Sequence, residues 1–164
     1  MKTARFAAAL AAALVIFGSC ASPGSTAKRP PKEKGVGERL SGRVWLLAGY
    51  AAGKTFIPIE PGHGSSGKLV FSPDRTFSGS TGWNSIGGAW SIRAERRPGE
   101  YPFTLRLKAS TKLAPPGAVA DRFERDILKN LEATAVIRLS RDEFRLLDGK
   151  GTVLLHYIFR REGL

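Results

Sequence analysis

The sequence predicts an α+β domain that is mostly antiparallel β, a curved sheet or partial barrel of about seven or eight short strands with one packed helix. Short apolar runs separated by turn residues fill positions 42–161. At 103–108, apolar side chains alternate with Thr, Arg and Lys, which is typical of a strand with one buried face. After Pro115-Pro116-Gly117 the apolar period becomes helical.

Strands are expected where Val, Ile, Leu and aromatic residues gather between turn signals. In chain order these segments are 43–49, 68–71, 76–79, 89–93, 103–108, 135–139, 143–147 and 152–160. The turn at 72–75, Ser-Pro-Asp-Arg, joins the second strand to the third. Turns at 140–142 and 148–151 join the last three strands into an antiparallel meander.

One amphipathic helix is expected after Gly117. Its apolar residues recur four apart, and the predicted buried face is Val119, Phe123, Ile127 and Leu131. Charged residues occupy the other side, namely Asp121, Arg122, Arg125, Asp126 and Lys129. Because Asp121, Glu124 and Asp126 lie near Arg122 and Arg125, we expect local ion pairs there and not a catalytic pair of carboxylates.

Residues 1–19 have the pattern of a lipoprotein signal peptide. Lys2 and Arg5 give a basic start, residues 6–17 are apolar, and Gly18-Ser19-Cys20 forms a lipobox in outline, although Phe17 replaces the usual Leu. The apolar run is shorter than the roughly 20 residues of a membrane-spanning helix. We expect lipid with acyl chains such as palmitate on Cys20, the chain's one cysteine. An ordinary secretory signal and an uncleaved anchor are the alternatives.

Residues 20–41 are expected to be the acylated cysteine and a flexible basic tether, because Pro, Gly, Ser and charged residues offer little to bury. Ala21 and Ser22 follow Cys20 directly, in place of the acidic residue that retains lipoproteins at the inner membrane, which favours a position at the outer membrane, facing the periplasm. The chain carries 26 Lys and Arg against 14 Asp and Glu. Besides the membrane, anionic envelope polymers or lipid headgroups, or an envelope protein, are expected partners. Export argues against nucleic acid.

Six short motifs follow one another along the domain: Trp45-Leu46-Leu47, Phe77-Ser78-Gly79, Gly82-Trp83-Asn84, Gly88-Ala89-Trp90, Thr111 to Pro115, and Glu124 with Ile127, Leu128 and Leu131. In this order they resemble the META domain of the HslJ-like heat-shock lipoproteins, from Trp45 to about Phe159. The resemblance implies a role in envelope maintenance or stress tolerance. Trp83 and Pro115 stand where that family has cysteines, so a thiol or disulfide role does not carry over.

The motif loop is the candidate site, made of Gly82, Trp83, Asn84 and Gly88. Asn84 can hydrogen-bond the nearby backbone, and the glycines allow turns that a side chain would forbid. This structural interpretation competes with a second one, in which Trp83 and Asn84 line a recognition surface.

Other patterns do not amount to catalytic, cofactor or metal sites. Residues 62–68 resemble a phosphate-binding loop, but Leu69 replaces the required Ser or Thr and Lys68 begins a strand instead of a helix. The two histidines, His63 and His156, lack the partners of a zinc site. We therefore expect a non-catalytic envelope lipoprotein. The open alternatives are a small-ligand or polyanion-binding module, indicated by a cavity or basic groove, and a hydrolase, indicated by clustered perturbed side chains.

Overall fold

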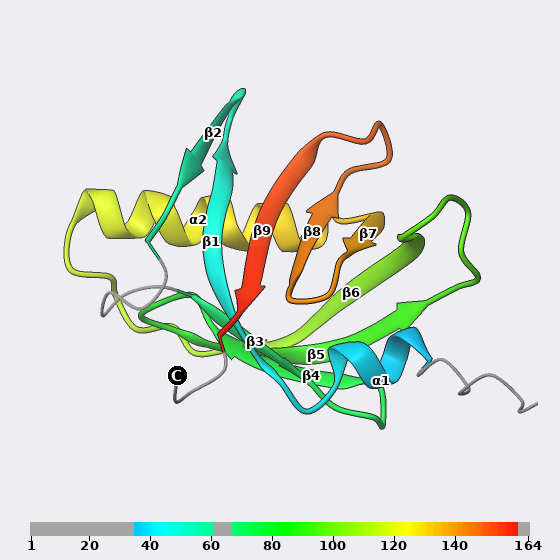
Figure 1. Cartoon of the computed structure of the whole chain (residues 1–164). Helices are drawn as coiled ribbons and strands as arrows, with labels where there is room; N and C mark the ends of the chain where they lie inside the picture. The colour runs from blue at the N-terminus through cyan, green and yellow to red at the C-terminus, as the bar shows by residue number, and fades with distance from the viewer. Residues whose placement is uncertain (1–34, 61–66, 161–164) are drawn as a thin grey trace, which may run out of the picture. The chain divides into compact units, whose positions relative to one another are not determined.

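A computed structural model describes residues 35–60 and 67–160 of the chain, and Figure 1 shows a β-barrel with a long helix beside it. The described residues belong to one compact unit, Glu33–Leu164. Its elements are α1 (Val36–Leu40), β1 (Val44–Ala52), β2 (Thr55–Pro58), β3 (Lys68–Phe71), β4 (Thr76–Ser80), β5 (Ser85–Ile92), β6 (Glu100–Ser110), α2 (Ala118–Glu132), β7 (Val136–Leu139), β8 (Glu143–Leu147) and β9 (Val153–Phe159).

The strands pair in the order β2-β1-β3-β4-β5-β6-β7-β8-β9, and β1 also pairs with β9. These pairings are antiparallel, and the β1–β9 pairing closes an eight-stranded barrel that leaves β2 as an extra strand beside β1. The predicted α+β, mostly antiparallel architecture is therefore confirmed. Strand β2 and the Gly-rich first half of β5 lie outside the predicted strands, because neither shows an apolar alternation.

Side chains fill the barrel interior. Trp45, Phe71, Phe103, Phe144 and Tyr157 are fully buried. The Phe71 ring packs edge-to-face against Phe103 and Phe144, with centroids 6.0 and 5.9 Å apart. The predicted alternation along β6 is confirmed, because Phe103 and Leu105 are buried while Thr104 and Arg106 are exposed. Inward residues from opposite strands thus meet in a packed core.

Helix α2 lies against β1, β9 and β6 and follows Gly117, whose φ is 98° (Figure 1). Its buried residues are Ala120, Glu124, Ile127, Asn130 and Leu131. Val119 is 87% exposed, so its predicted burial is wrong. The side chain of Phe123 is half-buried against Tyr50. The reason is geometric: residues four apart advance about 40° beyond a full turn at each step, so Val119 and Leu131 do not share a face.

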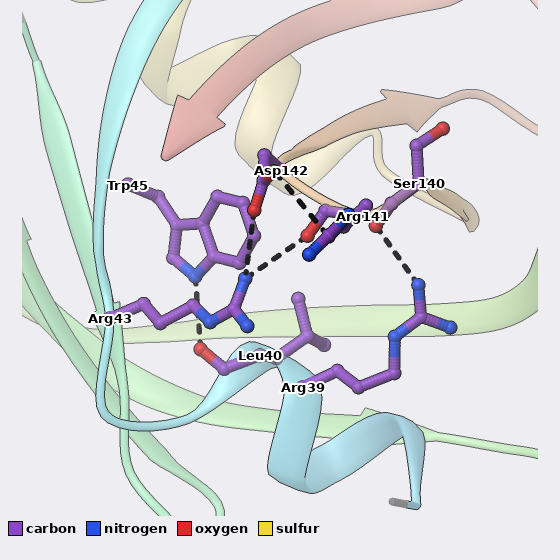
Figure 2. Close-up of polar contacts among 7 residues, drawn as sticks. All are labelled: Arg39, Leu40, Arg43, Trp45, Ser140, Arg141 and Asp142. Atoms are coloured by element: carbon purple, nitrogen blue, oxygen red, sulfur yellow. Dashed lines mark hydrogen bonds and ion pairs between the residues drawn. The ribbon is translucent and has the colours of Figure 1, made fainter. Parts of the chain in front are cut away.

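Helix α1 shows that the predicted tether is wrong for its last residues. Leu40 is fully buried, and its carbonyl accepts a hydrogen bond from Trp45 Nε1 at 2.9 Å. Figure 2 shows Arg39 donating to the Ser140 carbonyl at 3.0 Å, which joins α1 to the β7–β8 turn. A five-residue helix with apolar side chains only at Val36 and Leu40 is too short to produce a periodic signal. The domain therefore includes residues 35–41, ahead of the predicted boundary at 42.

The first residues of the barrel reinforce the same junction. Arg43 Nη1 donates to the Arg141 carbonyl at 3.0 Å and lies 3.6 Å from Asp142 Oδ1 (Figure 2). The Arg43 guanidinium also lies 4.8 Å from the centroid of the Phe159 ring, within the range of a cation–π contact. These contacts connect the beginning of β1 to the β7–β8 turn and to the end of β9.

Candidate functional site

The motif loop forms the β4–β5 turn and the beginning of β5. Gly82 has a φ of 113°, which favours glycine, and its N–H donates to Ser80 Oγ at 3.0 Å. Trp83 is half-buried, with its ring 6.0 Å from that of Phe123 in an edge-to-face contact. The loop is thus packed onto helix α2.

Asn84 is a buried hydrogen-bond hub, 3% exposed. Its Oδ1 accepts from Thr111 Oγ1 and from the N–H of Leu113, both at 2.8 Å. Its Nδ2 donates to the Leu113 carbonyl at 3.0 Å and to Glu124 Oε2 at 2.9 Å. Both donors and both acceptor positions of the amide are therefore used. Asn84 is thus enclosed and joins three chain segments, the backbone-bonding arrangement that the structural interpretation of the motif predicts.

The expected ion pair of Glu124 with a neighbouring arginine is wrong, because Glu124 faces the interior as the partner of Asn84. It is 7% exposed, and Thr81 Oγ1 donates to its Oε1 at 3.0 Å while Asn84 holds its Oε2. The helical period could have predicted the burial of Glu124, since it lies four residues after Ala120 and three before Ile127 on the buried face. The predicted pairing of Arg125 with Asp121 is present.

Gly88 allows two strands to approach each other closely. A Cβ at this position would lie 2.0 Å from the Arg106 carbonyl oxygen in β6 and 2.9 Å from Cε1 of Phe77. Real Cβ atoms do not reach such distances. The close approach of β5 and β6 therefore requires glycine at this position of the motif.

A cationic cleft of about 270 Å³ lies over β6 and β7, between the β5–β6 and β8–β9 turns. Figure 1 shows both turns on the same side of the barrel. The floor includes Pro102 and Val136, which are paired across β6 and β7. Its basic lining residues are Arg96, Arg97, Arg138 and Lys150. We call these residues and their surroundings the arginine cleft.

Hydrogen bonds hold the β5–β6 turn that carries Arg96 and Arg97. The Arg96 N–H donates to the Glu100 carbonyl at 2.9 Å, and the Glu100 N–H donates to the Arg97 carbonyl at 2.8 Å. Glu95 Oε1 accepts from the Gly99 N–H at 2.6 Å and from the Tyr101 hydroxyl at 3.1 Å. These hydrogen bonds fix the backbone of the turn that carries the two adjacent arginines.

The charges of the arginine cleft are only partly balanced. Arg138 donates to Glu100 Oε1 from Nε and Nη2, at 2.9 and 2.6 Å. Asp148 is the other acidic residue of the lining. Hydrogen bonds from backbone N–H groups, that of Thr152 foremost, lower its pKa. Arg96, Arg97 and Lys150 are exposed, and within the described part of the chain they form no ion pair. Three cations thus face solvent around the cleft, a suitable arrangement for an anionic ligand.

The remaining sequence predictions have different outcomes. Cys20 and His63 lie outside the described residues. His156 is on the outer face of β9, with Nε2 2.9 Å from Glu143 Oε2. Within 35–60 and 67–160, no group of three or more His, Cys, Asp or Glu is arranged to hold a metal ion. In the same ranges, no helix is long and apolar enough to cross a bilayer.

No protein-family model matches the sequence, and no curated protein matches it. The fold is similar to that of a DUF4847 family protein from Bacteroides vulgatus ATCC 8482, with 15% identity and a TM-score of 0.54 over 79% of this chain and 100% of the other. It is also similar to a Burkholderia xenovorans protein solved by NMR, with 18% identity and a TM-score of 0.55 over 80% and 97% of the two chains. At these identities the likeness establishes a shared fold.

Proposed function

We propose that this protein is a lipid-anchored lipoprotein of the bacterial envelope whose barrel domain works by binding and not by catalysis. The lipobox ending at Cys20 supports the anchor. The motif resemblance to the META domain of HslJ-like lipoproteins supports a role in envelope maintenance or stress tolerance. Glu124, one of the carboxylates weighed for catalysis, is engaged with Asn84 in a hydrogen bond that helps to hold the fold together.

The ligand in this proposal is a phosphate-bearing envelope polymer or headgroup, such as lipopolysaccharide. The observation that carries it is the arginine cleft, where Arg96, Arg97 and Lys150 face solvent within one concave surface. Guanidinium groups bind phosphate through two parallel N–H donors, and lysine adds a mobile point charge. A polymer with repeated phosphates would contact several of these cations at once.

The anchor is tested by Cys20→Ala. If lipid is attached at this cysteine, the variant should move from the detergent phase to the aqueous phase and lose labelling by a fatty-acid analogue. Two or more acyl chains hold a protein firmly on a membrane, so the change in partitioning should be nearly complete. Equal partitioning of the variant and the wild type would contradict the anchor.

The arginine cleft is tested by the triple variant Arg96→Ala, Arg97→Ala and Lys150→Ala. Its affinity for immobilised lipopolysaccharide at low salt should fall on the order of 10- to 100-fold, because each lost cation removes a charge-assisted contact. The slope of log affinity against log salt concentration should also become shallower, since fewer counterions are released. Surface plasmon resonance over a series of salt concentrations measures both quantities.

The matched control removes the same charge near α2, from the exposed side chains of Lys112, Arg122 and Lys129. It should change the affinity and the salt slope much less than the cleft variant does. Equal losses in the two triple variants would mean that net charge alone governs binding, which contradicts a site in the cleft.

A further inference from the structure

A second concave surface lies on the outside of the barrel, between the β1–β2 hairpin and strands β8 and β9. Its volume is about 430 Å³, within the usual range of small-molecule sites. The residues that matter to its chemistry are Lys54, Phe56, Arg145, Val153 and His156. Figure 1 shows the β1–β2 hairpin extending from the barrel, and Thr55 and Phe56 of β2 line the groove. We call it the hairpin groove, and it shares no residue with the arginine cleft.

The apolar part of the hairpin groove is centred on Phe56, which is 40% exposed. The Phe56 ring occupies the space above Gly49 of β1, where an added Cβ would lie 2.6 Å from Cε1 and Cζ of the ring. Ala51 and Val153 extend the apolar lining. The missing side chain at Gly49 therefore lets an aromatic ring lie low against the sheet while part of it remains open to solvent.

The polar part of the hairpin groove is basic. Arg145 and His156 share Glu143 as a partner, at 3.6 Å from Arg145 Nη2 to Oε1 and 2.9 Å from His156 Nε2 to Oε2. Glu143 is not among the lining residues, whereas both of its basic partners are. Lys54 is exposed at the hairpin turn and forms no ion pair with the residues that the structure describes. The lining thus presents cations beside an apolar surface.

We propose that the hairpin groove binds an anionic amphiphile, a single acyl chain with a carboxylate or phosphate head. The chain would lie on Phe56 and Val153, and the head would receive hydrogen bonds from Lys54 and Arg145. Burial of methylene groups stabilises the complex, and the cations select an acidic head over a neutral one. This inference extends beyond the proposed polymer binding, because it rests on different residues and on a different ligand chemistry.

Calorimetric titration tests this proposal without detergent, on the chain from position 20 to the C-terminus with the substitution Cys20→Ser. Dodecanoate and dodecyl phosphate, both below their micelle concentrations, should bind saturably to one site, and their relative affinities distinguish the two heads. Dodecyl maltoside, which has the same chain and a neutral head, should bind at least about tenfold more weakly. Acetate and inorganic phosphate at the same concentrations should give no saturable signal.

Three substitutions then locate the site. Lys54→Ala removes one cation, Phe56→Ala removes the ring, and Gly49→Ala displaces the ring while leaving every charge in place. Each should weaken dodecanoate binding on the order of tenfold. The matched controls are Lys129→Ala and Val119→Ala, an exposed lysine and an exposed apolar residue on α2, which should bind like the unsubstituted chain.

Thermal unfolding of each variant separates lost binding from lost folding. Lys54 is exposed, so Lys54→Ala should leave the midpoint nearly unchanged. Equal weakening by the groove substitutions and the α2 controls would overturn the proposal. Absence of saturable dodecanoate and dodecyl phosphate binding by the unsubstituted chain would overturn it as well. Binding of dodecyl maltoside as tight as that of dodecanoate would contradict the role of the cations.

Discussion

Asn84→Ala should lower the free energy of unfolding by about 3–5 kcal/mol, because it removes one buried and three partly buried hydrogen bonds at once. The loss leaves Glu124 Oε2 without its amide donor and both backbone groups of Leu113 without their partners. Glu124 is 7% exposed, and a buried polar group that loses its hydrogen bond carries the full cost of desolvation. Urea denaturation followed by tryptophan fluorescence measures the change.

Ser85→Ala is the control, since the Ser85 side chain is exposed next to Asn84 in the sequence. Its effect should lie within about 0.5 kcal/mol of zero. A double-mutant cycle between Asn84→Ala and Glu124→Ala should show that the two losses are not additive, because each substitution removes the same contact. Additive effects, or equal midpoints for Asn84→Ala and Ser85→Ala, would contradict the hub.

Gly88→Ala should destabilise the barrel by about 3 kcal/mol or more, beyond the usual cost of overpacking, because the new methyl group meets a backbone atom. The Arg106 carbonyl oxygen would be 2.0 Å away, and it cannot rotate aside as a side chain does. Strands β5 and β6 must separate locally to admit the Cβ, which weakens their pairing. Thermal unfolding should show a lower midpoint.

The neighbouring glycine provides a matched control in the same strand. A Cβ at Gly87 would lie no nearer than 3.5 Å to its closest neighbour, the Phe77 carbonyl oxygen, which is ordinary contact. Gly87→Ala should therefore be neutral or slightly stabilising, because alanine has less freedom than glycine in the unfolded chain. If the two alanine variants unfold at the same temperature, β5 and β6 do not approach as closely as described.

The motif loop illustrates how far the candidate site was predictable. Local chemistry identified Gly82, Asn84 and Gly88 as residues with backbone roles, since glycine and asparagine suit tight turns. The partners that explain them, Glu124 and Arg106, are distant in the sequence. Only folding brings these partners within reach of the loop, so they could not be identified from the spacing of the motif.

The arginine cleft was predictable only as a positive charge. Arg96, Arg97, Arg138 and Lys150 are spread over the second half of the sequence, and none belongs to a motif. Pairing of β6 with β7, and the proximity of two turns, assembles them into one concavity. The excess of positive charge is therefore read from composition, whereas the strand order decides that these four side chains line one concavity.

The sequence by itself determined the features that depend on neighbouring residues: the alternation of β6, the turns of the last meander, the existence of α2 and the excess of positive charge. The tertiary structure decided the closure of the barrel by β1 and β9, the burial of Leu40 in what reads as a tether, and the inward position of Glu124. Local sequence patterns predict helices, strands and turns from steric preference and from the spacing of apolar residues. Strand register, close approach and the pairing of buried polar groups depend on contacts between residues far apart in the chain, so they emerge only when the core is packed.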